Sequence, residues 1–176
     1  MRTEGTLLLA DGEVKFELYG DEAPETVAAF VEAIRDGIWN GGTFVRAVRK
    51  DNDKGSPQID VIQAVAAGEA ERTIAHESTE ATGLKHLAGT LSVPRHMPGS
   101  GSAAGFFVCM RDSPELDAGS LRNPDRQGFA AFGRVTSGLG LLRPIHRAEC
   151  LEGGADAYIS GQELRNPVKI VKMSIL

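Results

Sequence analysis

The sequence predicts a mainly β protein, a closed eight-stranded antiparallel barrel capped by two α-helices. About eight short β-rich runs are spaced along the chain, and a strong hairpin signal opens it. Only two segments carry the apolar spacing of a helix. With 176 residues, 41% hydrophobic and 24% charged, the chain has the size and composition of one compact domain, which we expect to cover residues 1–176.

The chain opens with a predicted hairpin followed by a helix. Two β-rich runs, Thr6–Ala10 and Glu13–Tyr19, flank the turn pair Asp11-Gly12. The helix begins at Pro24, because apolar residues then recur at positions 27, 30, 31 and 34. Gly37 suits the residue after its end, so one face of this helix is expected to be buried.

Further β-rich runs follow this helix, separated by polar or Gly- and Ser-rich connections. They cover Thr43–Val48, Asp60–Ala66, Thr90–Val93, Phe106–Met110, Ala130–Val135 and Val168–Leu176. In the last run, Val171, Met173 and Ile175 are expected on one face. A short second helix is predicted over Leu139–Ile145. The segment Gly153–Asn166 is expected to be a surface connection.

Composition and spacing argue against several classes of function. The net charge is −5 and the basic residues are scattered, which argues against a nucleic-acid partner. No apolar run approaches the roughly 20 residues that span a bilayer. The two cysteines and four histidines lack the spacing of a metal site, so we expect no metal and no disulfide.

The start of the chain bears on its compartment. Residues 1–5 lack the basic region and apolar stretch of a secretory signal, which favours a cytoplasmic protein. A periplasmic protein whose signal peptide had been removed would look the same.

Five short stretches stand in an order and spacing that match one protein family across nearly the whole chain. They are Glu17-Leu18-Tyr19 with Ala23–Val27, Phe44-Val45-Arg46, Val61-Ile62-Gln63, Phe106-Phe107-Val108 and Phe132–Val135. Together they resemble the cyclophilin family of peptidyl-prolyl cis/trans isomerases. The long segment between Arg46 and Gln63 is similar to that of the bacterial branch of this family.

The resemblance implies a cofactor-free isomerase and assigns its site. Arg46 matches the catalytic arginine, Gln63 the glutamine that supports it, and Phe107 the aromatic floor of a proline pocket. The other walls and the substrate-backbone contacts are implied at Val61, Leu116, Phe129, Pro94, Arg95 and His96. The expected partners are proline-containing peptides and unfolded or partly folded proteins, bound by a monomer.

The chemistry explains why an arginine suits such a site. Rotation about an X-Pro bond must break amide resonance, against a barrier of about 18–20 kcal/mol. No covalent bond is made or broken, so the site needs only to hold the twisted imide better than either planar isomer. A fixed guanidinium aimed at the proline nitrogen, which regains its lone pair in the twisted state, would do this.

Several positions depart from the family pattern. Val45 replaces a histidine, Ala64-Val65 replaces a Gly-Gly pair, and Pro94 removes an N–H beside the substrate groove. Gly105 replaces a Gln or Glu, and Glu115 stands where many members have the tryptophan that assists cyclosporin binding, so we expect weak binding of that drug.

These departures leave rival hypotheses open. The first is a cyclophilin-fold module that binds proline-containing segments without useful turnover, which the altered rim favours. The second is a ligand-holding barrel, which would need an open interior, whereas the bulky apolar strands predict a filled one.

Overall fold

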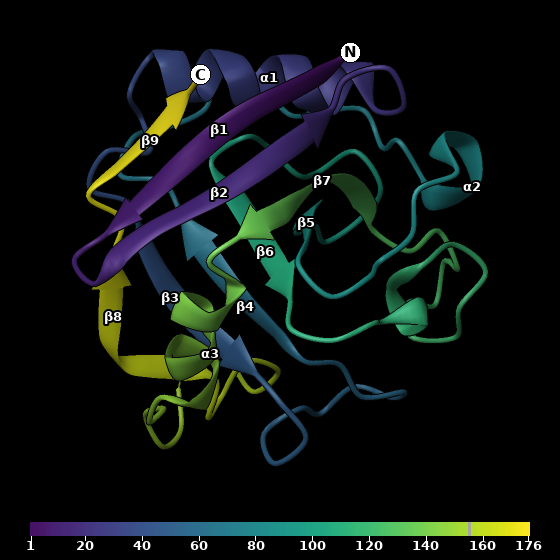
Figure 1. Cartoon of the computed structure of the whole chain (residues 1–176). Helices are drawn as coiled ribbons and strands as arrows, with labels where there is room; N and C mark the ends of the chain where they lie inside the picture. The colour runs from purple at the N-terminus through teal and green to yellow at the C-terminus, as the bar shows by residue number, and fades with distance from the viewer. Residues whose placement is uncertain (155) are drawn as a thin grey trace.

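The computed structural model describes residues 1–154 and 156–176, which form one nine-stranded antiparallel sheet with helices at its ends (Figure 1). The strands are β1 (Arg2–Leu9), β2 (Gly12–Tyr19), β3 (Thr43–Val48), β4 (Val61–Val65), β5 (Thr90–Val93), β6 (Gly105–Cys109), β7 (Ala130–Ser137), β8 (Glu163–Lys169) and β9 (Lys172–Ile175). The helices are α1 (Pro24–Arg35), α2 (Thr79–Thr82) and α3 (Leu139–Arg147), with a 3-10 turn at Pro114–Leu116. The predicted mainly β fold with two main helices is confirmed.

The sheet curls so that its two edge strands are consecutive in the chain. The strand order is β8-β3-β4-β6-β5-β7-β2-β1-β9. Between the edges, the N–H of Ile170 donates to the Gly42 carbonyl at 2.7 Å, and the N–H of Val171 donates to the Leu8 carbonyl at 2.8 Å. The chain itself therefore carries the backbone from one edge to the other.

The crossing of the chain from one sheet edge to the other, at Ile170 and Val171, changes the predicted C-terminal structure in three ways. The single closing strand becomes two, which makes nine strands instead of eight. Val171 lies at the crossing and is 47% exposed, so it does not share the buried face of Met173. The segment Gly153–Asn166 is more than a surface connection, because β8 begins within it at Glu163.

The two main helices lie at opposite ends of the curled sheet (Figure 1). Helix α1 begins with Pro24 at its first turn and ends before Gly37, whose φ of 74° suits a residue without a side chain. Its buried face includes Val27, Phe30 and Ile34. Phe30 stacks on Phe132 of β7 with ring centroids 4.2 Å apart, which fixes α1 on the sheet.

The covered face of the sheet is filled by large side chains. Trp39, Phe44 and Phe106 are almost completely buried there, together with Phe30 and Phe132. This filled core disfavours the hypothesis of a ligand-holding barrel. Among the described residues, no helix is both long and apolar enough to cross a membrane.

A second, smaller apolar cluster lies on the opposite face of β4 and β6. Side chains alternate along a strand, so Ile62 and Val108 face the main core while Val61 and Phe107 face away from it. The second cluster consists of Val48, Ile59, Val61, Phe107, Cys109 and Leu116, with Phe129 packed against it. The candidate site is built on this outer face.

Candidate functional site

A hollow of about 430 Å³ opens over the second apolar cluster. Every residue that the sequence assigned to the site lines it: Arg46, Val61, Gln63, Pro94, Arg95, His96, Phe107, Leu116 and Phe129. They come from strands β3, β4 and β6 and from loops next to the strands, so the fold brings together positions up to 83 residues apart (46 to 129). The volume is that of a site for a small ligand or a few residues of peptide.

Arg46 is held in place by two glutamines. It lies on β3 opposite Gln63 of β4, and its Nη1 donates to Gln63 Oε1 at 3.0 Å. Its Nε donates to Gln162 Oε1 at 2.8 Å. Gln162 is 1% exposed, and its own Nε2 donates to the Asn52 carbonyl at 2.9 Å. The guanidinium is thus fixed in orientation by neutral groups.

The charge of Arg46 is left available to a ligand. Burial lowers the pKa of the guanidinium, but an arginine starts so far above neutrality that it stays charged. Within the described part of the chain, Arg46 forms no salt bridge with a carboxylate. A cation that is partly desolvated and not neutralised interacts strongly with a lone pair or carbonyl brought next to it.

Gln162 was not predicted from the sequence. It lies 116 residues from Arg46, at the end of a segment whose polar and glycine-rich composition indicated a plain connection. The pairing of β8 with β3 places it, because Glu163 stands opposite Arg46 in that ladder. Only the isolated apolar residues Leu164 and Val168 in this polar stretch could have hinted at the strand.

Aromatic side chains form the base and one wall of the hollow. Phe107 is 5% exposed and meets Phe129 edge to face, with ring centroids 5.4 Å apart. Phe129 is also in contact with Arg95, whose guanidinium carbon lies 5.2 Å from the ring centroid. Arg95 itself donates to the Gly128 carbonyl at 2.8 Å and pairs with Asp125. The apolar walls are therefore fixed before any ligand binds.

Under Phe107 lies a buried chain of hydrogen bonds. The His86 ring is parallel to that of Phe107, with centroids 6.2 Å apart. His86 Nδ1 donates to Asp117 Oδ1 at 2.7 Å, and its Nε2 lies 2.9 Å from Ser92 Oγ. Burial by itself raises the pKa of Asp117. The hydrogen bonds from the His86 ring and backbone lower this pKa by more than burial raises it, so the net shift is downward. This polar chain supports the base of the hollow.

The hollow continues into a second one of about 520 Å³. The two share Pro94, His96 and Tyr158, as well as Arg46, Gln63 and Arg95. At this rim Pro94 packs against Gly105, where an added Cβ would come within 3.3 Å of the proline ring. Two of the departures from the family pattern therefore touch each other. The two hollows together form a groove, which we call the Arg46 groove.

One side of the Arg46 groove is closed by the two long loops that carry Asp53 and Arg122 and by the segment that carries Tyr158. Arg122 forms a bidentate salt bridge with Asp53, through Nη1 to Oδ2 at 2.9 Å and Nη2 to Oδ1 at 3.0 Å. The side chains are only 5% and 1% exposed. Arg122 Nη2 also donates to the Tyr158 hydroxyl at 3.2 Å. None of these three residues was expected at the site, because pairing between distant segments leaves no local pattern in the sequence.

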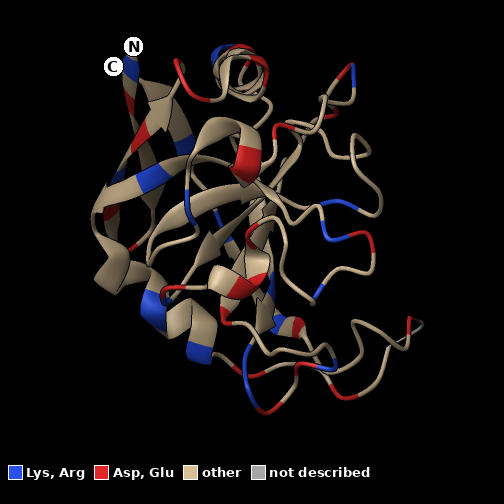
Figure 2. Cartoon of the chain, turned by 90° about the vertical axis from the view of Figure 1, so that its right-hand side faces the viewer, with Lys and Arg blue, Asp and Glu red and all other residues tan. Residues whose placement is uncertain are grey.

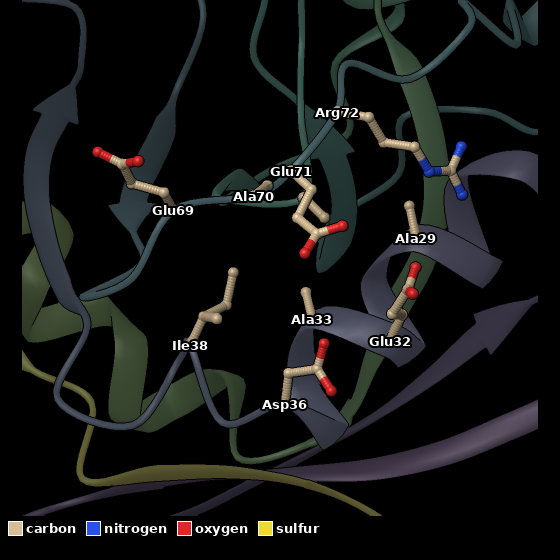
Figure 3. A pocket seen from close by; sticks show the side chains of 10 residues that line it. Ala29, Glu32, Ala33, Asp36, Ile38, Glu69, Ala70, Glu71 and Arg72 are labelled. Carbon is tan, nitrogen blue, oxygen red and sulfur yellow. The ribbon is translucent and has the colours of Figure 1, made fainter.

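Other features lie apart from this groove. A cavity of about 90 Å³ between α1 and residues 69–72 shares no lining residue with it, and Figure 3 shows carboxylates of Glu32, Asp36 and Glu71 around its small apolar floor. Acidic and basic residues are mixed over the face seen in Figure 2. No cluster of three or more potential metal ligands occurs among the residues that the structure describes.

Comparisons with known proteins identify the family of this chain. The family model described as "Cyclophilin type peptidyl-prolyl cis-trans isomerase/CLD" matches residues 1–175. "Peptidyl-prolyl cis-trans isomerase B" of Bacillus subtilis is 30% identical over 149 residues, 84% of this chain and 94% of its own. A "Probable peptidyl-prolyl cis-trans isomerase" of Brucella suis is 26% identical over 174 residues, covering 96% and 80%.

A solved structure shares the fold. The cyclophilin type peptidyl-prolyl cis-trans isomerase of Cryptosporidium parvum superposes with a TM-score of 0.73 over all of this chain and 98% of its own, at 18% identity. The same protein, solved in the presence of the dipeptide Ala-Pro, gives 0.71. The match over residues 1–175 decides the assignment, and the chain belongs to the cyclophilin-type peptidyl-prolyl cis-trans isomerase family.

Proposed function

We propose that this protein accelerates cis/trans isomerisation of X-Pro bonds in peptides and in unfolded or partly folded proteins. The observation that carries the proposal is the fixed, unneutralised guanidinium of Arg46 beside an apolar hollow. Its Nε and Nη1 donate to Gln162 and Gln63, which leaves the Nη2 hydrogens available to a ligand. The hollow above Phe107 suits a pyrrolidine ring, and the rim leaves the peptide backbone in water.

In the proposed mechanism the chain acts by electrostatics and shape. The substrate proline ring lies against Phe107 and Phe129 and is held there while the preceding carbonyl rotates. The Arg46 guanidinium donates to the proline nitrogen as that atom regains its lone pair, which stabilises the twisted state more than either planar one. Gln63 keeps the guanidinium aimed. Each 1.36 kcal/mol of such preference gives about a tenfold acceleration.

A non-catalytic function is the second candidate. Pro94 lines both halves of the Arg46 groove and has no N–H to offer to a substrate backbone. A groove altered in this way could hold a proline-containing segment without turnover. That module would need the apolar hollow but not the charge of Arg46.

The deciding measurement is the cis-to-trans rate of an Ala-Pro peptide, followed by NMR exchange with and without the protein. We expect acceleration by the wild type, loss of at least tenfold in kcat/KM with Arg46→Ala, and partial activity with Arg46→Lys, which keeps the charge but loses the planar fork. Arg165→Ala is the matched control, since Arg165 is an exposed arginine paired with Glu149 outside the groove. A folded wild type that binds the peptide without accelerating it would favour the binding module.

A further inference from the structure

Among the described residues, Tyr158 is the only Phe, Tyr or Trp side chain that lines both hollows of the Arg46 groove. It is 51% exposed, and its ring centroid lies 5.8 Å from the guanidinium carbon of Arg46. At that distance an aromatic ring and a cation attract each other. A peptide that reaches from the proline hollow into the second one must therefore pass this ring.

The Tyr158 hydroxyl is tied to a rigid support. It accepts a hydrogen bond from Arg122 Nη2, and the same guanidinium donates through Nη1 to the Pro57 carbonyl at 2.8 Å. Asp53, the partner of Arg122, also accepts from the backbone N–H groups of Gly55 at 2.9 Å and Ile59 at 2.8 Å. A buried ion pair with all these bonds satisfied is costly to rearrange.

The loops that carry this support are bound to each other as well. Lys54 donates to the carbonyls of Ala157, at 2.8 Å, and Ser160. Asn52 Nδ2 donates to the Gly161 carbonyl at 3.1 Å. The backbone on either side of Tyr158 is thus fastened to the loop that holds Asp53. The ring is held in position before a ligand arrives, which lowers the entropy lost on binding.

We propose that Tyr158 is a substrate-contacting, specificity-determining residue that favours apolar or aromatic side chains flanking the proline. The inference rests on the proposed function of the Arg46 groove and adds the class of substrate that it selects. Tyrosine is well suited to this role because it offers a large, rigid face at a low cost in side-chain entropy, with its polar end already bonded.

The test is the affinity of the whole protein for two peptides, Ala-Gly-Pro-Gly and Ala-Phe-Pro-Phe, titrated by NMR. The wild type should prefer the second peptide. Tyr158→Ala should reduce this preference about three- to tenfold, within the range measured for aromatic pairs. Tyr158→Phe keeps the ring and should retain the preference within about twofold. Tyr19→Ala removes the other tyrosine, which lies on β2 outside the groove, and should change nothing.

The outcomes separate this inference from the isomerase proposal. Binding titrations need no turnover, so a change in preference without any acceleration of isomerisation would support Tyr158 and refute the isomerase. Acceleration together with an unchanged preference in Tyr158→Ala would overturn the role of Tyr158 alone. Equal weakening of both peptides would also overturn it, because a merely structural residue would not discriminate between them.

Discussion

The Nε of Arg46 donates to the side-chain oxygen of Gln162 at 2.8 Å, and this bond joins β3 to the residue that precedes β8. The Gln162 backbone carbonyl accepts from the Ala47 N–H at 2.9 Å, so the same residue is fixed at both its main chain and its side chain. The orientation of Arg46 is therefore set by a pairing between a strand in the first third of the chain and one near its end.

We expect Gln162→Ala to lower kcat/KM for X-Pro peptides about tenfold, mostly through kcat. A hydrogen bond to a charged group is worth about 1.5–3 kcal/mol, and freeing Nε lets the guanidinium swing away from the reacting nitrogen. Peptide affinity should change little, because the apolar hollow stays intact. Steady-state kinetics on the variant and on Gln127→Ala, an exposed control, would check this; an unchanged kcat would contradict it.

Gly128→Ala should unfold more easily than Gly119→Ala, although both glycines have positive φ values, 62° and 88°. A Cβ at Gly128 would lie 2.6 Å from the Leu116 carbonyl oxygen, whereas nothing lies within 4 Å at Gly119. The free energy of unfolding should fall by about 1 kcal/mol in the control Gly119→Ala, because of backbone strain. In Gly128→Ala it should fall by about 1–3 kcal/mol more, because of overpacking. Urea unfolding of both variants measures the difference, and equal losses would disprove the steric argument.

The buried His86–Asp117 contact predicts a specific loss of stability in acid. The folded-state pKa of Asp117 is depressed, so its contribution is present above the unfolded value near 4 and is lost as the pH falls through the folded value. Asp117→Asn should therefore be less stable than the wild type at pH 6, with a gap that narrows below about pH 4. Asp36→Asn, at an exposed position, is the control. Urea titrations at pH 3 to 7 test this, and a gap independent of pH would contradict it.

The two cysteines should differ sharply in reactivity. Cys109 is fully buried, and burial raises the pKa of its thiol well above the usual range, so it offers almost no reactive thiolate at pH 8. Cys150 is only partly buried. A disulfide reagent should modify one thiol per chain in the native protein and two in urea. Cys150→Ser should abolish the native reaction; two fast thiols in the native wild type would refute the prediction.

Local signals predicted the parts of the fold that depend on neighbouring residues. The Asp11-Gly12 turn, the apolar stripe of α1 and the alternation of β4 and β6 are all encoded within a few positions. The division of the last strand at Ile170 and Val171 depends on hydrogen bonds to distant carbonyls, so the alternation of apolar residues indicated one continuous strand. The support of Arg46 by Gln162 was missed for the same reason.

In the candidate site, too, some residues could be predicted from the sequence and others depend on contacts between distant segments. The nine residues expected to line it do so, because each stands on or beside a motif whose position the family resemblance fixed. Tyr158, Arg122 and Asp53 belong to loops outside the five matching motifs, and a buried ion pair between residues 69 positions apart has no signature in sequence. Their place could be found only from the folded chain.

The buried chain from Asp117 through His86 to Ser92 has the order of groups found in serine hydrolases. A search by triad geometry alone would flag this protein as an esterase or protease. Yet Ser92 is 0% exposed and lies behind Phe107, so no acyl group can approach its hydroxyl. Covalent serine-directed probes should therefore leave the protein unlabelled. A catalytic triad differs from this buried arrangement in that its serine hydroxyl is accessible to the substrate.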